Sequence, residues 1–201
     1  MKKRLSFVLA FAVILSLAGL WTWRYIILNR YYDDLDNGSY QLYKTGELVP
    51  FEDDGNDLYT DLNGYSIRVD GYEICDYDQY LNDSNFAIAQ DENDPDKLVL
   101  VYITLINEDC APNPVSLPDL KLRGVDTPIN MDWDLLPLAN PVLDGHTGLA
   151  ITPGTEQKLV LPYGLWKNSF EGNTWRNIDE YTLYLQVTST LTTKEVLLNP
   201  L

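Results

Sequence analysis

The segment Leu98–Ile106, with the sequence LVLVYITLI, is the feature that most restricts how this chain can fold. Side chains alternate between the two faces of a strand, and here both faces are apolar. A strand of this kind must be covered on both sides, so it belongs in the interior of a sheet that packs against other layers. The segment therefore predicts a layered β-domain with this strand at its centre.

Shorter strand signals lie before and after this segment, separated by glycine, proline and asparagine turns. Strands are expected at residues 67–75 with a bulge at Gly71, at 115–122 with a break or edge position at Pro118, and at 156–161, 180–188 and 195–198. No sustained helical period follows residue 30, although residues 165–178 allow one or two helical turns. The pattern predicts an all-β, antiparallel β-sandwich over residues 63–201.

Residues 1–30 have the properties of a membrane segment. Basic residues precede the uncharged stretch Leu5–Trp23, which as a helix measures roughly 28 Å, about the thickness of the hydrocarbon core. Trp21 and Trp23 fall at the expected lipid–water boundary, where Arg24 can reach the headgroups. We expect a transmembrane helix that precedes the sandwich and holds it outside the cytoplasm as a single-pass membrane protein.

A cleaved signal peptide is the alternative interpretation of the same residues. Leu5–Leu15 has the length of a signal-peptide core, and Ser16–Ala18 resembles a small-residue cleavage site. Cleavage there would leave an apolar new N-terminus, because the apolar run continues through Trp21. A retained anchor is therefore favoured, and in the alternative the domain is secreted.

Charge is distributed unevenly along the chain. The formal net charge is −16, and all 30 acidic residues lie beyond residue 30. An acidic domain is repelled by nucleic acids and anionic headgroups, which argues against both as ligands, whereas cations and basic proteins or peptides remain compatible. Residues 31–62 combine acids with glycine and proline and have few periodic apolar residues, so an acidic linker is expected there, partly ordered where Tyr40, Leu42 and Tyr43 dock on the domain.

Four segments of the domain carry a resemblance to a known group of proteins. They are Asn63–Ile67 (NGYSI), Val101–Asn107 (VYITLIN), Leu117–Leu122 (LPDLKL) and Ile151–Glu156 (ITPGTE). Their order resembles the telokin-like, immunoglobulin-fold ectodomains of uncharacterised membrane-anchored proteins and lipoproteins of Gram-positive bacteria, which are domains of unknown function. The resemblance implies an immunoglobulin-like sandwich that serves as an extracytoplasmic interaction domain. It carries over no functional residues.

Motifs for catalysis and metal binding are weak. His146, the only histidine, lies in a turn, and no motif for a serine or cysteine nucleophile accompanies it, so no enzymatic activity is expected. The acidic runs Glu52–Asp57 and Asp91–Asp96 are rich in oxygen ligands for calcium, although solvated loops are the simpler interpretation. No cofactor is expected, with calcium as the weak alternative.

Cys75 and Cys110 are the only cysteines, and in an exported domain they favour a disulfide. If strands 67–75 and 98–106 are antiparallel neighbours, the two cysteines lie roughly 30 Å apart, which prevents the bond. A first strand that crosses between sheets after Gly71 would bring them together. Both a disulfide and buried free thiols stay open.

Trp133, flanked by Asp132 and Asp134, is the best candidate for ligand contact, because aromatic rings stack on sugars beside acids that form hydrogen bonds. The competing interpretation is a loop tryptophan that packs on one end of the sandwich.

The expected location and the weak catalytic motifs favour a binding module for a protein or peptide, in an accessory, sensor or adhesion role. The alternative is a carbohydrate-binding or cell-wall-acting domain that uses Trp133, Trp166 or Trp175.

Overall fold

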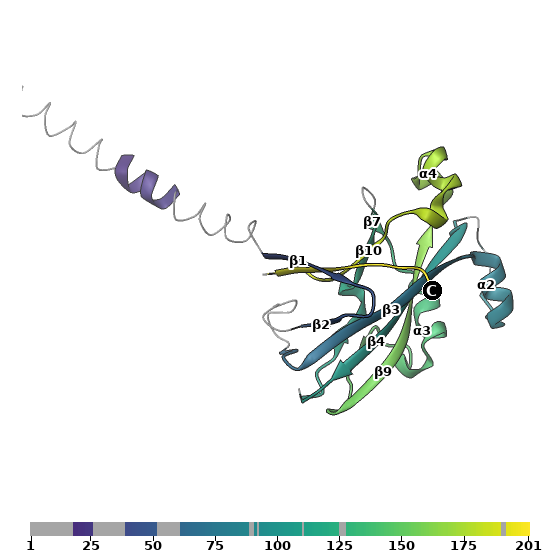
Figure 1. Ribbon diagram of the computed structural model, residues 1–201, viewed down its shortest axis with the longest axis horizontal. Coiled ribbons are helices and arrows are strands. Elements are labelled where there is room, and N and C mark those ends of the chain that lie inside the picture. The colour runs from purple at the N-terminus through teal and green to yellow at the C-terminus, as the bar shows by residue number, and fades with distance from the viewer. Residues whose placement is uncertain are drawn as a thin grey trace, which may run out of the picture. The chain divides into compact units, whose positions relative to one another are not determined.

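The computed structural model describes residues 18–25, 39–51, 61–88, 91, 93–109, 111–124, 128–189 and 192–201. The chain divides into two units, Met1–Gly38 and Ser39–Leu201 (Figure 1). In the first unit residues 18–25 are helical, and Trp21, Trp23 and Arg24 have exposed side chains there. No helix within the described ranges is both long enough and apolar enough to cross a membrane. Residues 1–17 of the expected membrane segment lie outside those ranges.

The second unit, called the β-domain below, is mostly β-structure with a few short helices. Its strands form sheet A in the order β1-β11-β10-β6-β7, sheet B in the order β2-β3-β4-β9, and a small sheet of β5 and β8. The strands are β1 (Ser39–Lys44), β2 (Leu48–Pro50), β3 (Tyr65–Asp76), β4 (Lys97–Asn107), β5 (Val115–Ser116), β6 (Lys121–Arg123), β7 (Pro128–Ile129), β8 (Gly148–Leu149), β9 (Thr155–Leu165), β10 (Tyr184–Thr188) and β11 (Thr192–Leu197).

The short helices all lie in the connections between strands. They are α2 (Tyr77–Ser84), α3 (Leu135–Ala139) and α4 (Gly172–Arg176), with 3-10 turns η1 (Leu117–Asp119), η2 (Pro141–Leu143), η3 (Lys167–Ser169) and η4 (Ile178–Glu180). The helical turns allowed by residues 165–178 are present as η3 and α4, and Pro118 breaks its segment into β5, η1 and β6. The domain is therefore mostly β rather than purely β.

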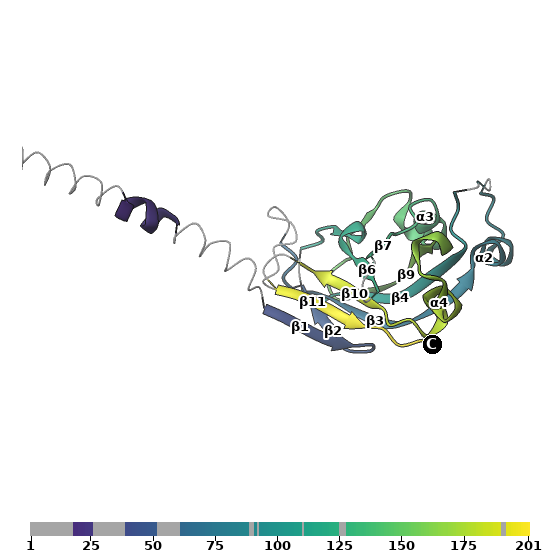
Figure 2. The ribbon, with the colours of Figure 1, turned by 90° about the horizontal axis from the view of Figure 1, so that it is seen from above.

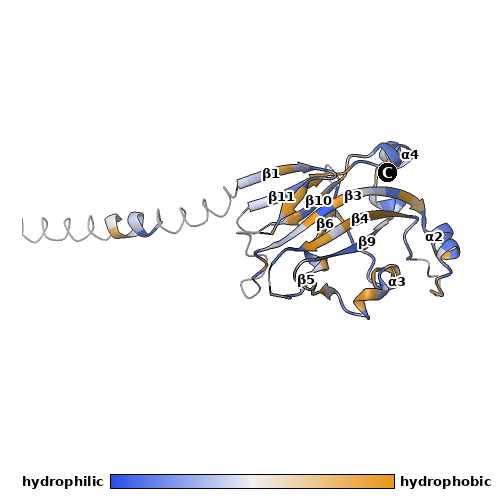
Figure 3. Cartoon of the chain, turned by 60° about the horizontal axis from the view of Figure 1, so that its bottom comes forward, coloured by the Kyte–Doolittle hydropathy of each residue, from blue (hydrophilic) through white to orange (hydrophobic). Residues whose placement is uncertain are grey.

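Strand β4 confirms the prediction made from its two apolar faces. It lies inside sheet B and pairs antiparallel with β3 and β9. One face, including Val101 and Leu105, joins the main core, and the other places Leu98 and Leu100 in a second cluster with side chains of α2 and α3. Figure 3 shows the apolar residues of β4 and α3. Sheet A covers one face, and the short helices cover the part of the other face around Leu98 and Leu100, whereas Tyr102 and Ile106 are partly exposed.

The main core lies between sheets A and B, and both contribute to it. Leu122, Leu185 and Val196 of sheet A and Ile67 and Leu161 of sheet B are at most 1 % exposed. Burying a side chain of this size contributes about 1.5–3 kcal/mol to folding. This shared core makes the β-domain one folded unit.

Gly71 produces the predicted bulge in β3. The register between β3 and β4 shifts between Val69 and Gly71, and Gly71 has a φ of +154°. A Cβ atom at this position would lie 2.4 Å from Cδ2 of Leu201. The tail crosses β3 here, because the Leu201 amide donates to the Tyr72 carbonyl at 3.0 Å. Glycine is favoured here because other residues rarely adopt this φ, and a Cβ would also displace the Leu201 side chain.

The structure places the middle part of the expected linker, residues 39–51, in the β-domain. Strand β1 pairs in parallel with β11, as Figure 2 shows, and β2 pairs antiparallel with β3. Residues 39–51 therefore belong to the β-domain, which begins well before residue 63. Residues 31–38 and 52–60 lie outside the described ranges. The partner of β1 is almost at the other end of the chain, so no local pattern indicates the pairing.

Helix α2 is the second element that the expected all-β fold missed. It is only eight residues long, its apolar face consists of Tyr77, Tyr80 and Leu81, and its ends carry capping residues. The Asp76 side chain accepts a hydrogen bond from the Gln79 amide at 3.3 Å, and Asn85 ends the helix in the left-handed conformation. Aspartate at an N-cap and asparagine after the last turn are helix signals that do not depend on apolar periodicity.

Candidate functional site

Trp133 lies at the turn that starts α3, and the flanking acids build this turn. Oδ1 of Asp132 accepts hydrogen bonds from the backbone amides of Asp134 at 3.1 Å and Leu135 at 2.9 Å. Leu135 is fully buried in the second cluster, whereas Trp133 is 51 % exposed. The tryptophan therefore does not fill the end of the core, and its ring is accessible to a ligand.

A pocket of about 340 Å³ with acidic walls lies at the same end of the domain. It is formed by the end of β3, the start of α2 and the loop before β4. Its lining residues are Asp76, Tyr77, Asp78, Asp91, Asp94, Pro95 and Asp96. Burial, followed by the charges of Asp132 and Asp94, raises the pKa of Tyr77 to about 12. Leu135, which follows Trp133 in this turn, packs in the same cluster as Tyr77, so the turn lies near the pocket.

Negative charge accumulates around Asp132. Burial raises the pKa of its carboxyl group, the amides of Leu135 and Asp134 lower it, and the charges of Asp134 and Asp94 raise it further. We call this region the acidic end, defined by Trp133 together with its carboxylates, Asp76, Asp78, Asp91, Asp94, Asp96, Asp132 and Asp134. A positive group that approaches here gains attraction from several carboxylates at once.

The acids of the 91–96 run mainly hold their own loop together. Asp91 accepts from the amide of Asn93 at 3.2 Å, Asp94 accepts from the amide of Asp91 at 2.7 Å, and Asp96 accepts from the amide of Lys167 at 2.7 Å. Within the described ranges, no group of three or more acidic, histidine or cysteine side chains is arranged to hold a metal ion. Residues 52–57, the other run proposed for calcium, lie outside those ranges.

The other two candidate tryptophans have structural contacts. The Trp166 indole donates to the Asn93 carbonyl at 2.8 Å, and its ring lies where a Cβ on Gly164 would come within 2.6 Å. Trp175 packs against the main core and lies 6.0 Å from Phe170 between ring centroids. Trp133 is therefore the best presented of the three for ligand contact.

Cys75 is a half-buried free thiol near the end of β3. Burial, with the charges of Glu73 and Asp76, raises its pKa to about 11, so the thiol is neutral at physiological pH. Strands β3 and β4 are antiparallel neighbours, and Cys75 lies opposite Leu98 at the start of β4. This is the arrangement for which a separation of roughly 30 Å between Cys75 and Cys110 is expected. Cys110 lies outside the described ranges. His146 is exposed in the turn expected for it.

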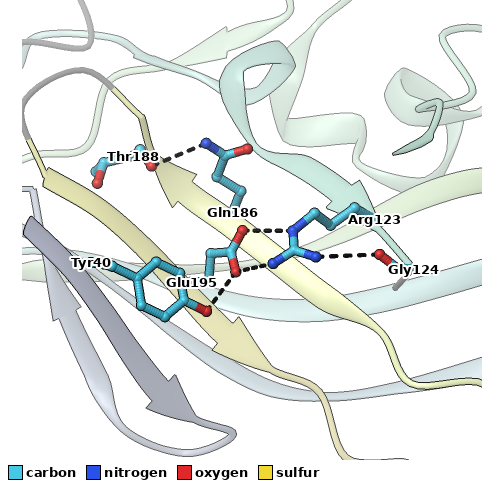
Figure 4. A network of polar contacts seen from close by, with 6 residues as sticks. All are labelled: Tyr40, Arg123, Gly124, Gln186, Thr188 and Glu195. Carbon is cyan, nitrogen blue, oxygen red and sulfur yellow. Dashed lines mark hydrogen bonds and ion pairs between the residues drawn. The ribbon is translucent and has the colours of Figure 1, made fainter. Parts of the chain in front are cut away.

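A polar network on sheet A was not predicted from the sequence (Figure 4). Nε of Arg123 donates to Oε1 of Glu195 at 2.7 Å, and its Nη2 donates to Oε2 at 2.5 Å. The Tyr40 hydroxyl donates to Oε2 at 2.9 Å, and the Arg123 guanidinium lies 4.6 Å from the centroid of Tyr184. The Glu195 side chain is only 4 % exposed, so these contacts replace its hydration. The network joins β1, β11, β10 and β6.

Comparison with known proteins identifies a family. Residues 40–192 match the family described as "Domain of unknown function (DUF5028)", and this range includes sheet B and most of sheet A, but only the first residue of β11. The search of curated proteins finds no match. Among solved structures, the chain is similar to the yjhA protein from Bacillus subtilis, with 12% identity and a TM-score of 0.45 over 78% of this chain and 99% of that chain. The chain belongs to the DUF5028 family, a domain of unknown function.

Proposed function

We propose that the protein is a non-enzymatic binding module, anchored by residues 1–30 in the cell membrane, whose β-domain lies outside the cytoplasm and binds a basic protein or peptide at the acidic end. The basic and apolar composition of residues 1–30 supports the location. The two sheets around one core support an immunoglobulin-like sandwich, which the resemblance implies. An accessory, sensor or adhesion role at the cell surface follows from this arrangement.

The exposed ring of Trp133 beside the acidic pocket is the observation that carries the proposal. Tryptophan and arginine are the side chains that most often dominate the energy of protein interfaces. An arginine of the partner can stack on the indole ring and at the same time approach Asp132 or Asp134. The net charge of −16 increases the rate of encounter with basic partners and repels acidic ones.

A binding titration with designed peptides tests this assignment. Full-length protein in lipid nanodiscs is titrated with an arginine-rich peptide that contains leucine, and with a matched peptide in which glutamate replaces arginine. We expect only the arginine peptide to bind, and its affinity to fall as salt increases because salt screens the charges. Binding of both peptides with equal affinity, or of neither at low salt, would contradict the proposal.

Two variants with matched controls locate the binding surface. Trp133→Ala is expected to weaken binding of the arginine peptide about tenfold or more, as hot-spot residues do. Leu48→Ala is its control, since Leu48 is 50 % exposed on β2. Asp134→Asn should also weaken binding, whereas Asp144→Asn should not, since Asp144 has the left-handed conformation that asparagine tolerates. Equal affinity in wild type and Trp133→Ala would remove the assignment to this surface.

Carbohydrate binding is the second candidate function, because an exposed tryptophan between two acids also suits a sugar ring. The same titration with cell-wall fragments distinguishes the two. Sugar binding would depend on Trp133, would be nearly independent of salt, and would quench indole fluorescence. No change in fluorescence with any fragment would exclude this candidate.

Protease treatment of intact cells tests the location separately from the ligand. We expect added protease to remove the β-domain from intact cells while the anchor segment stays with the membrane fraction. A β-domain that is cleaved only after the cells are broken would contradict the proposed orientation. Recovery of the protein in the culture medium would instead support the secreted form.

A further inference from the structure

A second pocket, of about 450 Å³, lies on the face of sheet B that points away from the main core. Its floor comes from β3, β4 and β9, and one wall comes from α3 and η2, which Figure 1 shows beside β9. Pockets of this volume commonly hold small organic ligands on apolar walls with a few polar groups. It shares no lining residue with the acidic pocket.

The polar part of the floor is Arg68, held in place by Asp70 and Thr104. Nε of Arg68 donates to Oδ1 of Asp70 at 2.7 Å, and Nη2 donates to Thr104 Oγ1 at 3.2 Å. The Thr104 hydroxyl donates to Oδ2 of Asp70 at 2.6 Å. The guanidinium has about five N–H donors, so these two bonds orient it and leave other donors for a ligand. Thr104 is fully buried, which fixes the arrangement.

Lys158 adds a second positive charge to the same pocket. It lies on β9, is exposed, and forms no ion pair within the described part of the chain. Burial is the largest single effect on the pKa of Asp70 and raises it. The hydrogen bonds from Thr104 and Arg68 and the charges of Arg68 and Lys158 together exceed this effect, so the pKa is lowered. Arg68 and Lys158 are the two cationic side chains of this pocket, Asp70 is paired with Arg68, and the charge of Glu156 also acts on Arg68.

Apolar side chains form another part of the pocket lining. Val142 is 48 % exposed and Leu201 is 74 % exposed, and both line the pocket. The Asn140 side chain joins the connection between α3 and η2 to β9. Its Nδ2 donates to the Val160 carbonyl at 2.6 Å, and its Oδ1 accepts from the Val160 backbone amide at 2.8 Å. These bonds fix the α3–η2 side of the pocket, which lowers the entropy cost of binding there.

We propose that this pocket binds a small amphipathic monocarboxylate, with its carboxylate between Arg68 and Lys158 and its apolar part against Val142 and Leu201. A carboxylate matches the planar fork of a guanidinium, and the apolar wall selects against inorganic anions. The net charge of −16 disfavours multiply charged anions, so a single charge fits best. The site is independent of the acidic end, and either assignment can fail without the other.

Calorimetric titration of full-length protein in nanodiscs, with empty nanodiscs as a blank, tests the proposal. The probes are propionate, 4-methylpentanoate and 3-phenylpropionate, each with its uncharged amide. We expect affinity to increase with the size of the apolar group and the amides to bind at least tenfold more weakly. Absence of binding by all three acids, or equal binding of acid and amide, would overturn it.

Paired variants assign the binding to the pocket. Lys158→Gln should weaken 3-phenylpropionate binding about tenfold, and Lys121→Gln, an exposed lysine on sheet A, should leave it unchanged. Val142→Asp should abolish binding by placing a negative charge on the wall. Leu138→Asp is its control, because Leu138 is 39 % exposed nearby but does not line the pocket. Unchanged binding in both pocket variants, with folding verified by circular dichroism, would overturn the assignment.

A peptide C-terminus could supply the same carboxylate and apolar group as a small acid, so a peptide is tested against the small acids. A tripeptide that ends in leucine carries an apolar side chain and a free carboxylate, as the small acids do. We expect it to bind more weakly than 3-phenylpropionate, because its extra backbone groups meet an apolar wall. Tighter binding of the tripeptide than of every small acid would overturn the small-molecule assignment.

Discussion

The two arginine–carboxylate pairs of the β-domain differ in what surrounds them. Arg123 and Glu195 come from different strands of sheet A, and the Glu195 side chain is 4 % exposed. Arg68 and Asp70 are two residues apart on β3, and each side chain is 32 % exposed. In the first pair, Glu195 accepts a hydrogen bond from the Tyr40 hydroxyl and Arg123 lies over the Tyr184 ring. The second pair lies in the floor of a pocket.

The difference shows how a charged pair can serve structure in one place and binding in another. Around Glu195, both carboxylate oxygens accept hydrogen bonds from within the domain, so the network is complete without a ligand. Around Arg68, the partners orient the guanidinium but leave donors facing a pocket that also contains Lys158. We therefore assign stability to the first pair and ligand binding to the second.

Arg123→Ala is expected to have the largest effect on stability. It leaves the Glu195 carboxylate buried without its main partner, and removing one member of a buried pair costs about 3–5 kcal/mol. Because the Arg123 side chain is 35 % exposed and water can replace part of it, we expect a loss of about 2–3 kcal/mol. Urea denaturation measures the free energy of unfolding. A loss below about 0.5 kcal/mol, typical of surface pairs, would break the comparison.

Glu195→Gln should change how stability depends on pH. Burial would raise the pKa of Glu195, but the hydrogen bonds from Arg123 and Tyr40 outweigh burial and lower it below the ordinary value of 4.5. The pair therefore contributes stability above pH 4.5, and this contribution is lost as the pH falls through the lowered folded-state pKa. We expect a cost of about 1–2 kcal/mol at neutral pH and a smaller decline in acid than in wild type. An unchanged pH profile would contradict this role.

Tyr40→Phe should have a smaller and more local effect. It removes one donor to Glu195 from a residue that is 55 % exposed on the edge strand β1. We expect a loss of about 0.5–1 kcal/mol, since Arg123 still satisfies the carboxylate. Hydrogen exchange should increase mainly in β1, which this contact joins to β11. Equal increases throughout sheet A would show that the hydroxyl supports the whole sheet.

Arg68→Ala should have the smallest effect on stability. Both side chains are partly exposed, the pair lies within one strand, and Thr104 still donates to Asp70 after the substitution, so we expect a loss of at most about 0.5 kcal/mol. The same variant should abolish binding of 3-phenylpropionate, which Arg123→Ala should not affect. This opposite pattern in the two variants sharpens the comparison, because stability and binding are measured on the same proteins. A loss of more than about 2 kcal/mol for Arg68→Ala would place both pairs in the structural class.

Several parts of the fold could be predicted because their signals are local. The two apolar faces of β4, the bulge at Gly71 and the break at Pro118 each depend on a few neighbouring residues. Strands β1 and β2 could not be found in this way, because β1 is fixed by pairing with the distant β11. Helix α2 was missed because its eight residues are too short for a sustained apolar period and much of its signal lies in its caps.

The candidate site was only partly visible in the sequence. Trp133 and its flanking acids stand out as a cluster, and their exposure agrees with a binding role. Their position beside Asp94 and Tyr77 depends on how the turn before α3 meets the loop before β4. The pocket of Arg68 and Lys158 has no sequence motif, since its residues come from separate strands and turns.

The sequence by itself determined the β-rich class, the central strand and the acidic character of the domain. These properties follow from side-chain alternation and composition, which are local or additive. Only the tertiary structure decided which carboxylates are buried and paired, and which cations line a pocket. Arg123 and Glu195 are separated by 72 positions, so their contact depends on the order of strands in a sheet, which local patterns do not encode.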